Sequence, residues 1–271
     1  MTDPKIDPMT DPVAKTILIA EEDGVRTITL NRPERRNAMT PEMQSELIAA
    51  FEDAGASRCR VVVLRGAGEA FCSGLDLSVL QQMHSKSAEE YRADALRVGR
   101  LFRSLFELAK PTIALVHGAA VAGGTGLATI CDFTLATPAA KFGYTEVRIG
   151  FVPALVSAYL ALQIGDKRSR DLLMTGRLFD SAEAMRLGLV NEVVAADELE
   201  LRVAALVRVL TANSPQSLAG TKQLMAKQNR VWLDAAIEAA MHANAEARET
   251  EDFREGIAAF LEKRKAVWTV G

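Results

Sequence analysis

The sequence has few residues of the types that build disulfide frameworks or zinc sites. Its 271 residues include three cysteines (Cys59, Cys72 and Cys131) and three histidines (His84, His117 and His242). No C-x-x-C or H-x-x-x-H spacing occurs among them. Three scattered cysteines are too few for a disulfide framework, and zinc sites need closely spaced ligands. We therefore expect neither a disulfide framework nor a metal site.

Long apolar runs and a strong excess of charge are also missing. No run reaches the length of a transmembrane helix, and the N-terminus has no signal-peptide pattern. The 32 basic and 35 acidic residues leave a net charge of −3 at pH 7, which gives no general attraction to nucleic acid or anionic lipid. We expect no nucleic-acid or membrane partner, and we expect the reducing cytoplasm as the location.

The N-terminal part of the chain predicts a tail, a hairpin and a helix. Residues 1–12 hold three Asp-Pro pairs, and because proline removes backbone donors and disfavours helix in its predecessor, we expect a disordered tail. Ile17–Ala20 and Val25–Leu30 read as two strands joined by a turn at Glu22–Gly24. A helix is expected to begin with Thr40 as N-cap and Pro41 at its first position.

The next segments alternate between buried strands and helices. Val61–Leu64 and Thr112–Val116 are short continuous apolar runs, as in strands of a parallel sheet. Between them, Ser87–Ala109 predicts a long helix; the apolar stripe would hold Leu96, Val98, Leu101, Leu105 and Leu108. Asp76 is placed to cap a short helix that follows it and precedes this long helix. Such alternation indicates an α/β fold with a parallel sheet.

After residue 153 the pattern becomes mostly helical. Helices are expected over residues 154–163, 168–175 and 181–187, followed by a short strand within 188–194. From Glu198 the chain reads as helix, with a start at Ser214–Pro215 and breaks near Gly220 and Asn229. We place a domain boundary near residue 200. The apolar residues beyond it predict contact with a neighbouring subunit.

Two loop-to-helix junctions follow buried strands and offer backbone N–H donors. Gly123, Gly124 and Gly126 open a helix, whose N-terminus has unpaired N–H groups and a positive dipole end. Gly123 could donate to an oxyanion, although close packing of the helix on a strand explains the glycines equally well. The N–H of Leu75, just before Asp76, is a candidate second donor. The spacing matches neither a dinucleotide fingerprint nor a P-loop.

One carboxylate, Glu146, lies in a short turn between apolar segments. Apolar surroundings raise the pKa of a carboxyl group, which suits proton transfer near neutral pH, although an exposed turn glutamate is the common alternative. Cys72 and Ser73 lack a G-x-S-x-G elbow and a neighbouring histidine, so lining or structural roles are expected. His117 reads as a buried structural histidine, and Arg35–Arg36 as a solvated pair or a phosphate contact.

Ordered motifs over about residues 15–265 resemble the enoyl-CoA hydratase/isomerase (crotonase) superfamily. They are LNRPERRNAM at Leu30–Met39, AFCSGLDL at Ala70–Leu77, HGAAVAGGTG at His117–Gly126 with Cys131–Asp132, AKFGYTEVRIG at Ala140–Gly150, TGR at Thr175–Arg177, AEAMRLGLV at Ala182–Val190 and EGIAAFLEKR at Glu255–Arg264. The resemblance implies a ββα spiral core over residues 13–200 and a helical trimerisation region over 201–271. It also implies a homotrimer or a dimer of trimers.

The same resemblance implies an acyl-CoA thioester substrate, with no cofactor beyond the coenzyme A of that substrate. The backbone N–H groups of Leu75 and Gly123 would hold the thioester oxygen, and Glu146 would be the acid/base. The residues implied along the coenzyme A path and the substrate are Arg36, Asn37, Ala38, Ala70, Ser73, Asp76, Leu77, Gly124, Phe260 and Lys263.

The sequence departs from the hydratase pattern at one catalytic position. Typical hydratases have two glutamates; the second matches Glu146, but the first falls on Gly126, which has no side chain. Glu89, Glu90 and Asp94 are candidates for a replacement acid. We therefore expect an enoyl-CoA hydratase/isomerase-type enzyme with a single glutamate. The alternatives are a double-bond isomerase without hydratase activity and a non-catalytic acyl-CoA-binding homologue.

Overall fold

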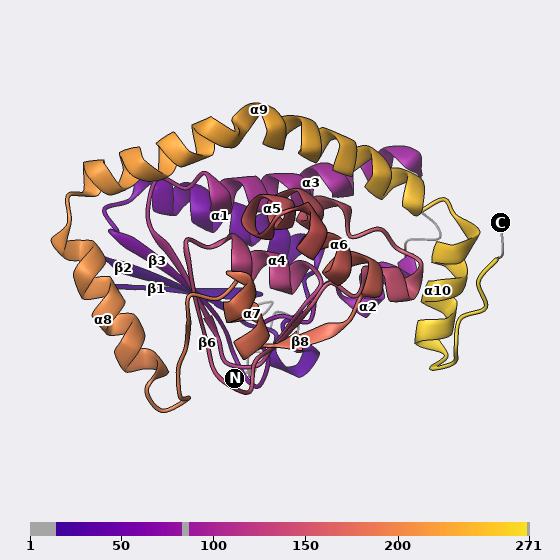
Figure 1. The fold of residues 1–271 in the computed structure, drawn as a ribbon, viewed down its shortest axis with the longest axis horizontal. Helices are drawn as coiled ribbons and strands as arrows, with labels where there is room; N and C mark the ends of the chain where they lie inside the picture. Colours follow the sequence, from indigo (N-terminus) through magenta and orange to yellow (C-terminus); the bar gives the residue numbers. More distant parts are fainter. Residues whose placement is uncertain (1–14, 83–86, 270–271) are drawn as a thin grey trace, which may run out of the picture.

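The computed structural model describes residues 15–82 and 87–269, which form a mixed α/β fold (Figure 1). The main sheet has the strand order β1-β2-β3-β4-β6-β9, and a second sheet has the order β5-β7-β8. In the main sheet β1 pairs antiparallel with β2, and every later pair is parallel. The strands are β1 (Ile17–Glu22), β2 (Val25–Leu30), β3 (Val61–Gly66), β4 (Thr112–Val116), β5 (Ala119–Val121), β6 (Phe133–Ala136), β7 (Lys141–Gly143), β8 (Leu178–Asp180) and β9 (Glu192–Val193).

Helices pack on both faces of the main sheet. One face packs on α8 through residues such as Val63 and Val203, and the opposite face belongs to the larger core with α1, α3 and α4. The helices are η1 (Pro33–Arg35), α1 (Pro41–Ala56), α2 (Leu77–Gln82), α3 (Ala88–Phe106), α4 (Gly123–Ile130), η3 (Glu146–Ile149), α5 (Ala154–Ile164), α6 (Asp166–Thr175), α7 (Ser181–Leu187), α8 (Leu199–Ala212), α9 (Pro215–Ala247) and α10 (Glu251–Leu261).

The predicted α/β class and the N-terminal elements are confirmed. The hydroxyl of Thr40 accepts a hydrogen bond from the N–H of Met43 at 3.2 Å, which caps α1. Ser87 and Glu90 form a complete capping box at the start of α3. Asp76 accepts from the N–H of Ser78 at 2.8 Å before α2. The predicted tail over residues 1–12 lies outside the described part of the chain.

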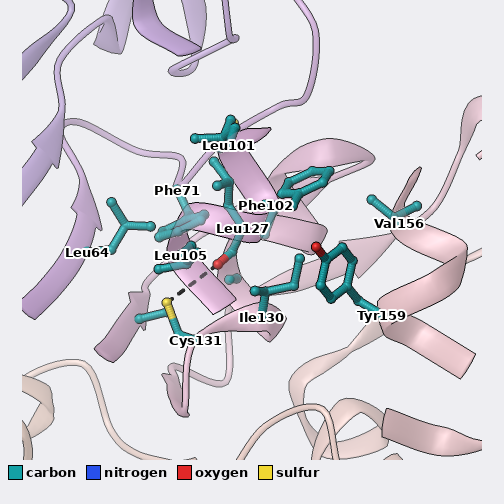
Figure 2. Packing of buried hydrophobic residues seen from close by; sticks show 14 of the residues in the cluster. Leu64, Phe71, Leu101, Phe102, Leu105, Leu127, Ile130, Cys131, Val156 and Tyr159 are labelled. Carbon is teal, nitrogen blue, oxygen red and sulfur yellow. Dashed lines mark hydrogen bonds between the residues drawn. The ribbon is translucent and has the colours of Figure 1, made fainter. Parts of the chain in front are cut away.

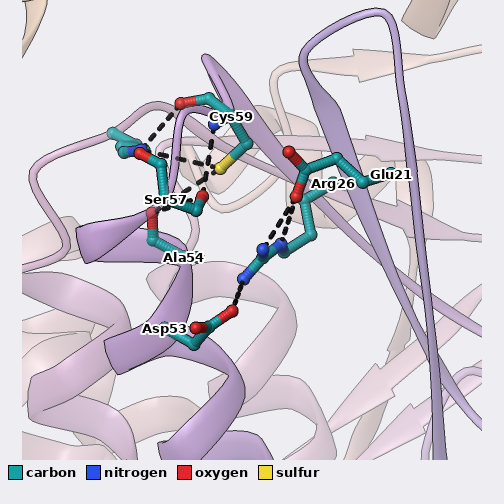
Figure 3. Close-up of polar contacts among 7 residues, drawn as sticks. Glu21, Arg26, Asp53, Ala54, Ser57 and Cys59 are labelled. Atoms are coloured by element: carbon teal, nitrogen blue, oxygen red, sulfur yellow. Dashed lines mark hydrogen bonds and ion pairs between the residues drawn. The ribbon is translucent and has the colours of Figure 1, made fainter.

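Arg26 ties the first hairpin to α1 (Figure 3). Its Nε donates to Glu21 Oε2 at 2.9 Å, and its Nη1 donates to Asp53 Oδ2 at 2.5 Å. Beside this pair, the Cys59 thiol donates to the carbonyl of Ala54 at the end of α1. These contacts fix the end of α1 against the sheet, and α1 begins at the loop that lines the site described below.

The structure departs from the sequence prediction at Leu96 and in the second sheet. Leu96 is 52% exposed and does not belong to the buried stripe of α3, where Phe102 packs instead. The second sheet, with β5, β7 and β8, was not expected, because its three-residue strands carry too little pattern. The short strand expected within residues 188–194 is present as β9 (Glu192–Val193).

The predicted breaks near Gly220 and Asn229 are absent, since α9 is continuous from Pro215 to Ala247. Figure 1 shows α9 passing over α3 and α5, and both helices contact it. The Asn229 side chain donates to the carbonyl of Met225 within the helix at 2.9 Å. A single internal glycine costs about 1 kcal/mol in a helix, which the packing of the other turns outweighs.

The C-terminal helices pack on the rest of the same chain and also expose apolar side chains. α8 contacts the main sheet, and α10 contacts η3. The exposed apolar residues of this region include Leu201, Val209, Leu224, Met225, Val231, Trp232, Phe260, Val267 and Trp268. The boundary near residue 200 and the subunit contact stay predictions.

The continuity of α9 generates the first prediction. A Cβ at Gly220 would meet no atom within 4 Å, so Gly220→Ala should stabilise the protein by about 1 kcal/mol through helix propensity alone. The matched control is Gly188→Ala, equally open but at φ +87°, which should destabilise by about 1 kcal/mol. Urea unfolding measures both. A destabilising Gly220→Ala would contradict a continuous helix.

Candidate active site

A cavity of about 470 Å³ lies where the loops after β2 and β3 meet the starts of α4 and α5. α3, η3, the C-terminal end of α9 and α10 complete its wall. The loop that contains Arg35 and Arg36 lines it. Leu75, Gly123 and Glu146 line it as well. The cavity therefore brings together three residues from three separate segments of the sequence.

Leu75 and Gly123 each present a backbone N–H that is not used by the fold. Leu75 lies in a short parallel bridge with Met39, in which the N–H of Met39 and the N–H of Asp76 are the donors. The N–H of Leu75 makes none of the hydrogen bonds found between described residues. Gly123 is the first residue of α4, and the first N–H groups of a helix have no intrahelical acceptor. Two donors thus line one cavity.

Close contacts between the two loops hold these donors in place. A Cβ at Gly124 would lie 2.2 Å from the carbonyl oxygen of Cys72, so only glycine allows α4 to approach this loop. Gly74, at φ +92°, contacts Ala122 in the same way. Ala122 itself has φ +52°, which is unfavourable for a residue with a Cβ. The strained residue directly precedes the Gly123 donor.

Glu146 begins η3 and directs its carboxyl group into the protein. Although part of the residue is exposed, its Oε2 atom is buried and has no hydrogen-bond partner among the described residues. Burial raises the pKa of Glu146 to about 7, and a hydrogen bond from its own backbone N–H opposes this rise only partly. The carboxyl group therefore exchanges a proton near neutral pH, as a general acid/base requires.

The position of Gly126 is filled by neighbouring apolar side chains. A Cβ built there would lie 2.7 Å from Val156 Cγ1 and 3.3 Å from Phe102 Cζ. Figure 2 shows Phe102 and Val156 in the packed cluster that contains Leu127 of α4. A glutamate cannot enter at residue 126 unless these side chains move. Core side chains thus fill the space next to Gly126 in which a second carboxylate would lie.

None of the candidate replacement acids lies free beside Gly126. Asp94 lines the cavity, but it accepts from Arg97 and pairs with Arg248. Glu90 caps α3 through Ser87, and Glu89 is exposed. Asp76 pairs with Arg32 at 2.7 Å, and these contacts with Ser78 and Arg32 keep the pKa of Asp76 below its ordinary value despite burial. Among the described carboxylates of the cavity, only Glu146 has a buried oxygen without a partner.

The structure brings most of the predicted site residues to the cavity. Those that line it are Arg36, Ala38, Ser73, Leu75, Asp76, Gly123, Glu146 and Phe260. Asn37, Ala70 and Gly124 are buried behind the wall, and Asn37 donates to the carbonyls of Ala67 and Ala70. Lys263 is exposed beyond α10, and Leu77 begins α2. The binding roles of these residues stay predictions.

Residues that suggested other chemistry have structural positions. Burial raises the pKa of the Cys72 thiol to about 12, which suppresses a nucleophilic thiolate. His117 Nε2 lies 2.8 Å from the carbonyl oxygen of Gly68. In the described residues, no group of three or more metal-ligating side chains could hold an ion. No described helix is long and apolar enough to cross a membrane.

The sequence reasoning missed one group of cavity residues. Gln44, Arg97, Asn244 and Arg248 line the cavity but belong to none of the quoted motifs. Asn244 and Arg248 belong to the C-terminal end of α9, whose charged and polar sequence resembles any solvated helix. Only the tertiary packing of α9 on α3 turns these side chains inward, so no local signal identifies them.

The chain is similar to known proteins in sequence and in structure. A family model described as enoyl-CoA hydratase/isomerase matches residues 20–270. A Thermus thermophilus protein, named provisionally as an enoyl-CoA hydratase, is 44% identical over 90% of this chain and 97% of its own length. The structure of an enoyl-CoA hydratase/isomerase from Xanthobacter autotrophicus Py2 has a TM-score of 0.84 at 31% identity, covering 94% of this chain and 99% of that chain. An enoyl-CoA hydratase from Mycobacterium avium subsp. paratuberculosis K-10 has the same TM-score at 28% identity, with the same coverage.

The burial of Glu146 predicts a pH-dependent cost to stability. Its pKa in the folded protein, about 7, exceeds the ordinary value of 4.5, so the folded state binds the proton more tightly than the unfolded state. The free energy of unfolding that depends on this group therefore falls as pH rises from about 4.5 to 7. The free energy of unfolding of Glu146→Gln should therefore exceed that of wild type by up to roughly 3 kcal/mol at pH 8 and by little at pH 4.5.

Urea unfolding of both proteins across this pH range measures the difference. The control is Glu249→Gln, which changes an exposed glutamate and should leave stability nearly unchanged at each pH. A constant difference between wild type and Glu146→Gln at all pH values would show that Glu146 is not buried as described.

Proposed function

The chain belongs to the enoyl-CoA hydratase/isomerase (crotonase) family, and we propose that it acts on an enoyl-CoA thioester with Glu146 as its single acid/base. One observation carries the proposal. The buried, unpartnered Oε2 of Glu146 lies in the same cavity as the N–H groups of Leu75 and Gly123. A proton acceptor and two oxyanion donors are the groups that enolate chemistry needs.

The two backbone donors would hold the thioester carbonyl oxygen. When a nucleophile adds to the double bond, or a proton leaves the α-carbon, negative charge moves onto this oxygen as an enolate forms. Fixed N–H groups in a site shielded from water stabilise that charge, and each donor contributes about 3–4 kcal/mol. The contacts of Gly124 and Gly74 between the two loops support this role, because they fix the donors before substrate arrives.

Hydration can proceed with one carboxylate. Ionised Glu146 takes a proton from water while the water oxygen bonds to the β-carbon and the C=C electrons move to the thioester oxygen. The protonated Glu146 then gives its proton to the α-carbon, the enolate collapses, and a 3-hydroxyacyl thioester results. The raised pKa of Glu146, about 7, suits both the acceptance and the return of the proton. The hydratase names of the similar proteins favour this reaction.

Double-bond isomerisation is the second candidate. Its basis is the apolar filling at Gly126 by Phe102 and Val156, which leaves no second acid to hold water. In this reaction Glu146 removes the α-proton of a 3-enoyl thioester, and the electrons delocalise over the oxyanion and the diene. Glu146 then returns the proton to the γ-carbon, and the double bond comes to lie between the α- and β-carbons.

The remaining expectations concern coenzyme A and assembly. Arg36, Ser73 and Phe260 line the cavity, as does Arg35, and they support a coenzyme A path along it. The exposed apolar residues of α8 and α9 support the expected trimer or dimer of trimers. No cofactor beyond the coenzyme A of the substrate is needed for either reaction.

The proposal predicts the effect of Glu146→Gln and of pH on turnover. Wild type should convert 2-enoyl-CoA to the hydrated product, with kcat/KM rising through pH of about 7 as Glu146 ionises. Glu146→Gln should lower kcat/KM by roughly 10²–10⁴-fold, because the amide cannot accept the proton. Initial rates with product analysis by mass spectrometry measure both.

Supplying 3-enoyl-CoA separately distinguishes the candidates. Turnover of 3-enoyl-CoA to 2-enoyl-CoA without hydration would identify the isomerase. Acyl-CoA binding without turnover of either substrate would favour the non-catalytic alternative. Undiminished turnover in Glu146→Gln would remove Glu146 from the mechanism.

A further inference from the structure

One end of the cavity is polar, which an alkyl chain alone does not require. Asp94 and Arg97 of α3, together with Asn244 and Arg248 of α9, line this end. Arg248 and Asn244 are 6% and 5% exposed, so their polar groups lie inside the protein. Ligand pockets use a few placed polar groups to select the ligand, and these four residues take no part in the chemistry proposed above.

Along α3, Asp94 at the polar end lies two helical turns from Phe102. Phe102, Val98 and Asp94 line the cavity from successive turns of one face of α3. Phe102 lies beside Gly123 and Gly126, and the helix rises about 12 Å from Phe102 to Asp94. An acyl chain whose thioester oxygen is held at Gly123 would therefore reach Asp94 and Arg248 with its far end.

The guanidinium of Arg248 is incompletely partnered. Its Nε and Nη1 atoms are buried and make no hydrogen bond to any described residue. Asp94 Oδ2 lies 3.5 Å from Nη1, which is beyond normal hydrogen-bond length. The rings of Tyr91 and Phe151 lie 5.4 and 5.7 Å from the guanidinium carbon. Burial also lowers the pKa of Arg248, and Asp94 only partly opposes this.

The charges at this end do not balance. Arg97 donates to Asp94 and, at 3.0 Å, to the side chain of Gln44. Among the described residues that line this part of the cavity, two guanidinium groups therefore face one carboxylate. The Oδ1 atom of Asn244, also buried, has no partner among the described residues; as an acceptor it needs a donor, so an anion would be held by the two arginines. Buried charge is normally paired and hydrogen-bonded, and a second carboxylate would complete this cluster.

We propose that Arg248, with Arg97 beside it, binds a carboxylate at the far end of the acyl group. The substrates would then be enoyl-CoA thioesters of dicarboxylic acids. This inference rests on the proposed function, because it requires the thioester to lie at Leu75 and Gly123. The competing role for Arg248 is structural, as a cation held between two rings and Asp94.

Binding measurements separate these roles without depending on turnover. Calorimetry would compare saturated acyl-CoA pairs of equal chain length, one ending in a carboxylate and the other in a methyl group, over a series of lengths. At the best length, wild type should bind the carboxylate form at least tenfold more tightly. Arg248→Met should abolish this preference, and affinity for the methyl form should stay equal or increase.

Two further variants keep the test decisive. Asn244→Asp has nearly the same shape and adds a negative charge. It should weaken binding of the carboxylate-ended thioester at least tenfold and affect binding of the methyl-ended thioester much less. This variant tests the carboxylate site even if Arg248→Met fails to fold. The matched control is Arg230→Met, which changes an exposed arginine of the same helix outside the cavity. It should retain the wild-type preference.

The outcomes distinguish the two levels of the proposal. If wild type binds methyl-ended thioesters as tightly as carboxylate-ended ones at every length, the carboxylate site is wrong and the proposed function stands. A preference that persists in both Arg248→Met and Asn244→Asp also overturns the site. If no acyl-CoA binds, the proposed function fails, and the inference fails with it.

Discussion

The close approach of α4 to the loop after β3 is the contact on which the site depends. β3 and β4 are neighbouring parallel strands, so the segments that follow them emerge at the same edge of the sheet. Gly124 against the carbonyl of Cys72, and Gly74 against Ala122, let these segments touch without intervening side chains. This contact places the N–H groups of Leu75 and Gly123 on one cavity. Ala122 takes an unfavourable φ at that point, which is the strain expected where a backbone is held for function.

The second constraint is the balance between packing and charge around Glu146. Burial raises the pKa of Glu146, and Phe102 and Val156 fill the space at Gly126. The same wall continues along α3 to a polar end with two arginines. Glu146, Leu75, Gly123 and the two arginines thus line one cavity. Specificity would come from the two arginines, and the chemistry from the other three residues.

Local patterns in the sequence predicted most of the fold, and the family resemblance predicted residues that line the cavity. The N-cap Thr40, the continuous apolar strands and the glycine cluster at Gly123 each depend on neighbouring residues only. The continuity of α9 past Gly220 could not be predicted, because packing on α3 and α5 outweighs a weak helix propensity. For the same reason Arg248 and Asn244 were missed: their inward direction is set by tertiary contacts. The Gly126 difference was visible in the sequence, but its replacement by Phe102 and Val156 was not.

The central claim is that Leu75 and Gly123 stabilise an enolate whose proton is exchanged by Glu146. Exchange of the α-hydrogens of a saturated acyl-CoA in D₂O, followed by mass spectrometry, tests this most directly, because it needs no double bond and no added water. The account predicts deuterium at the α-carbon with wild type and none above the uncatalysed rate with Glu146→Gln. Equal exchange by both proteins, or no exchange by wild type with the thioester bound, would contradict it.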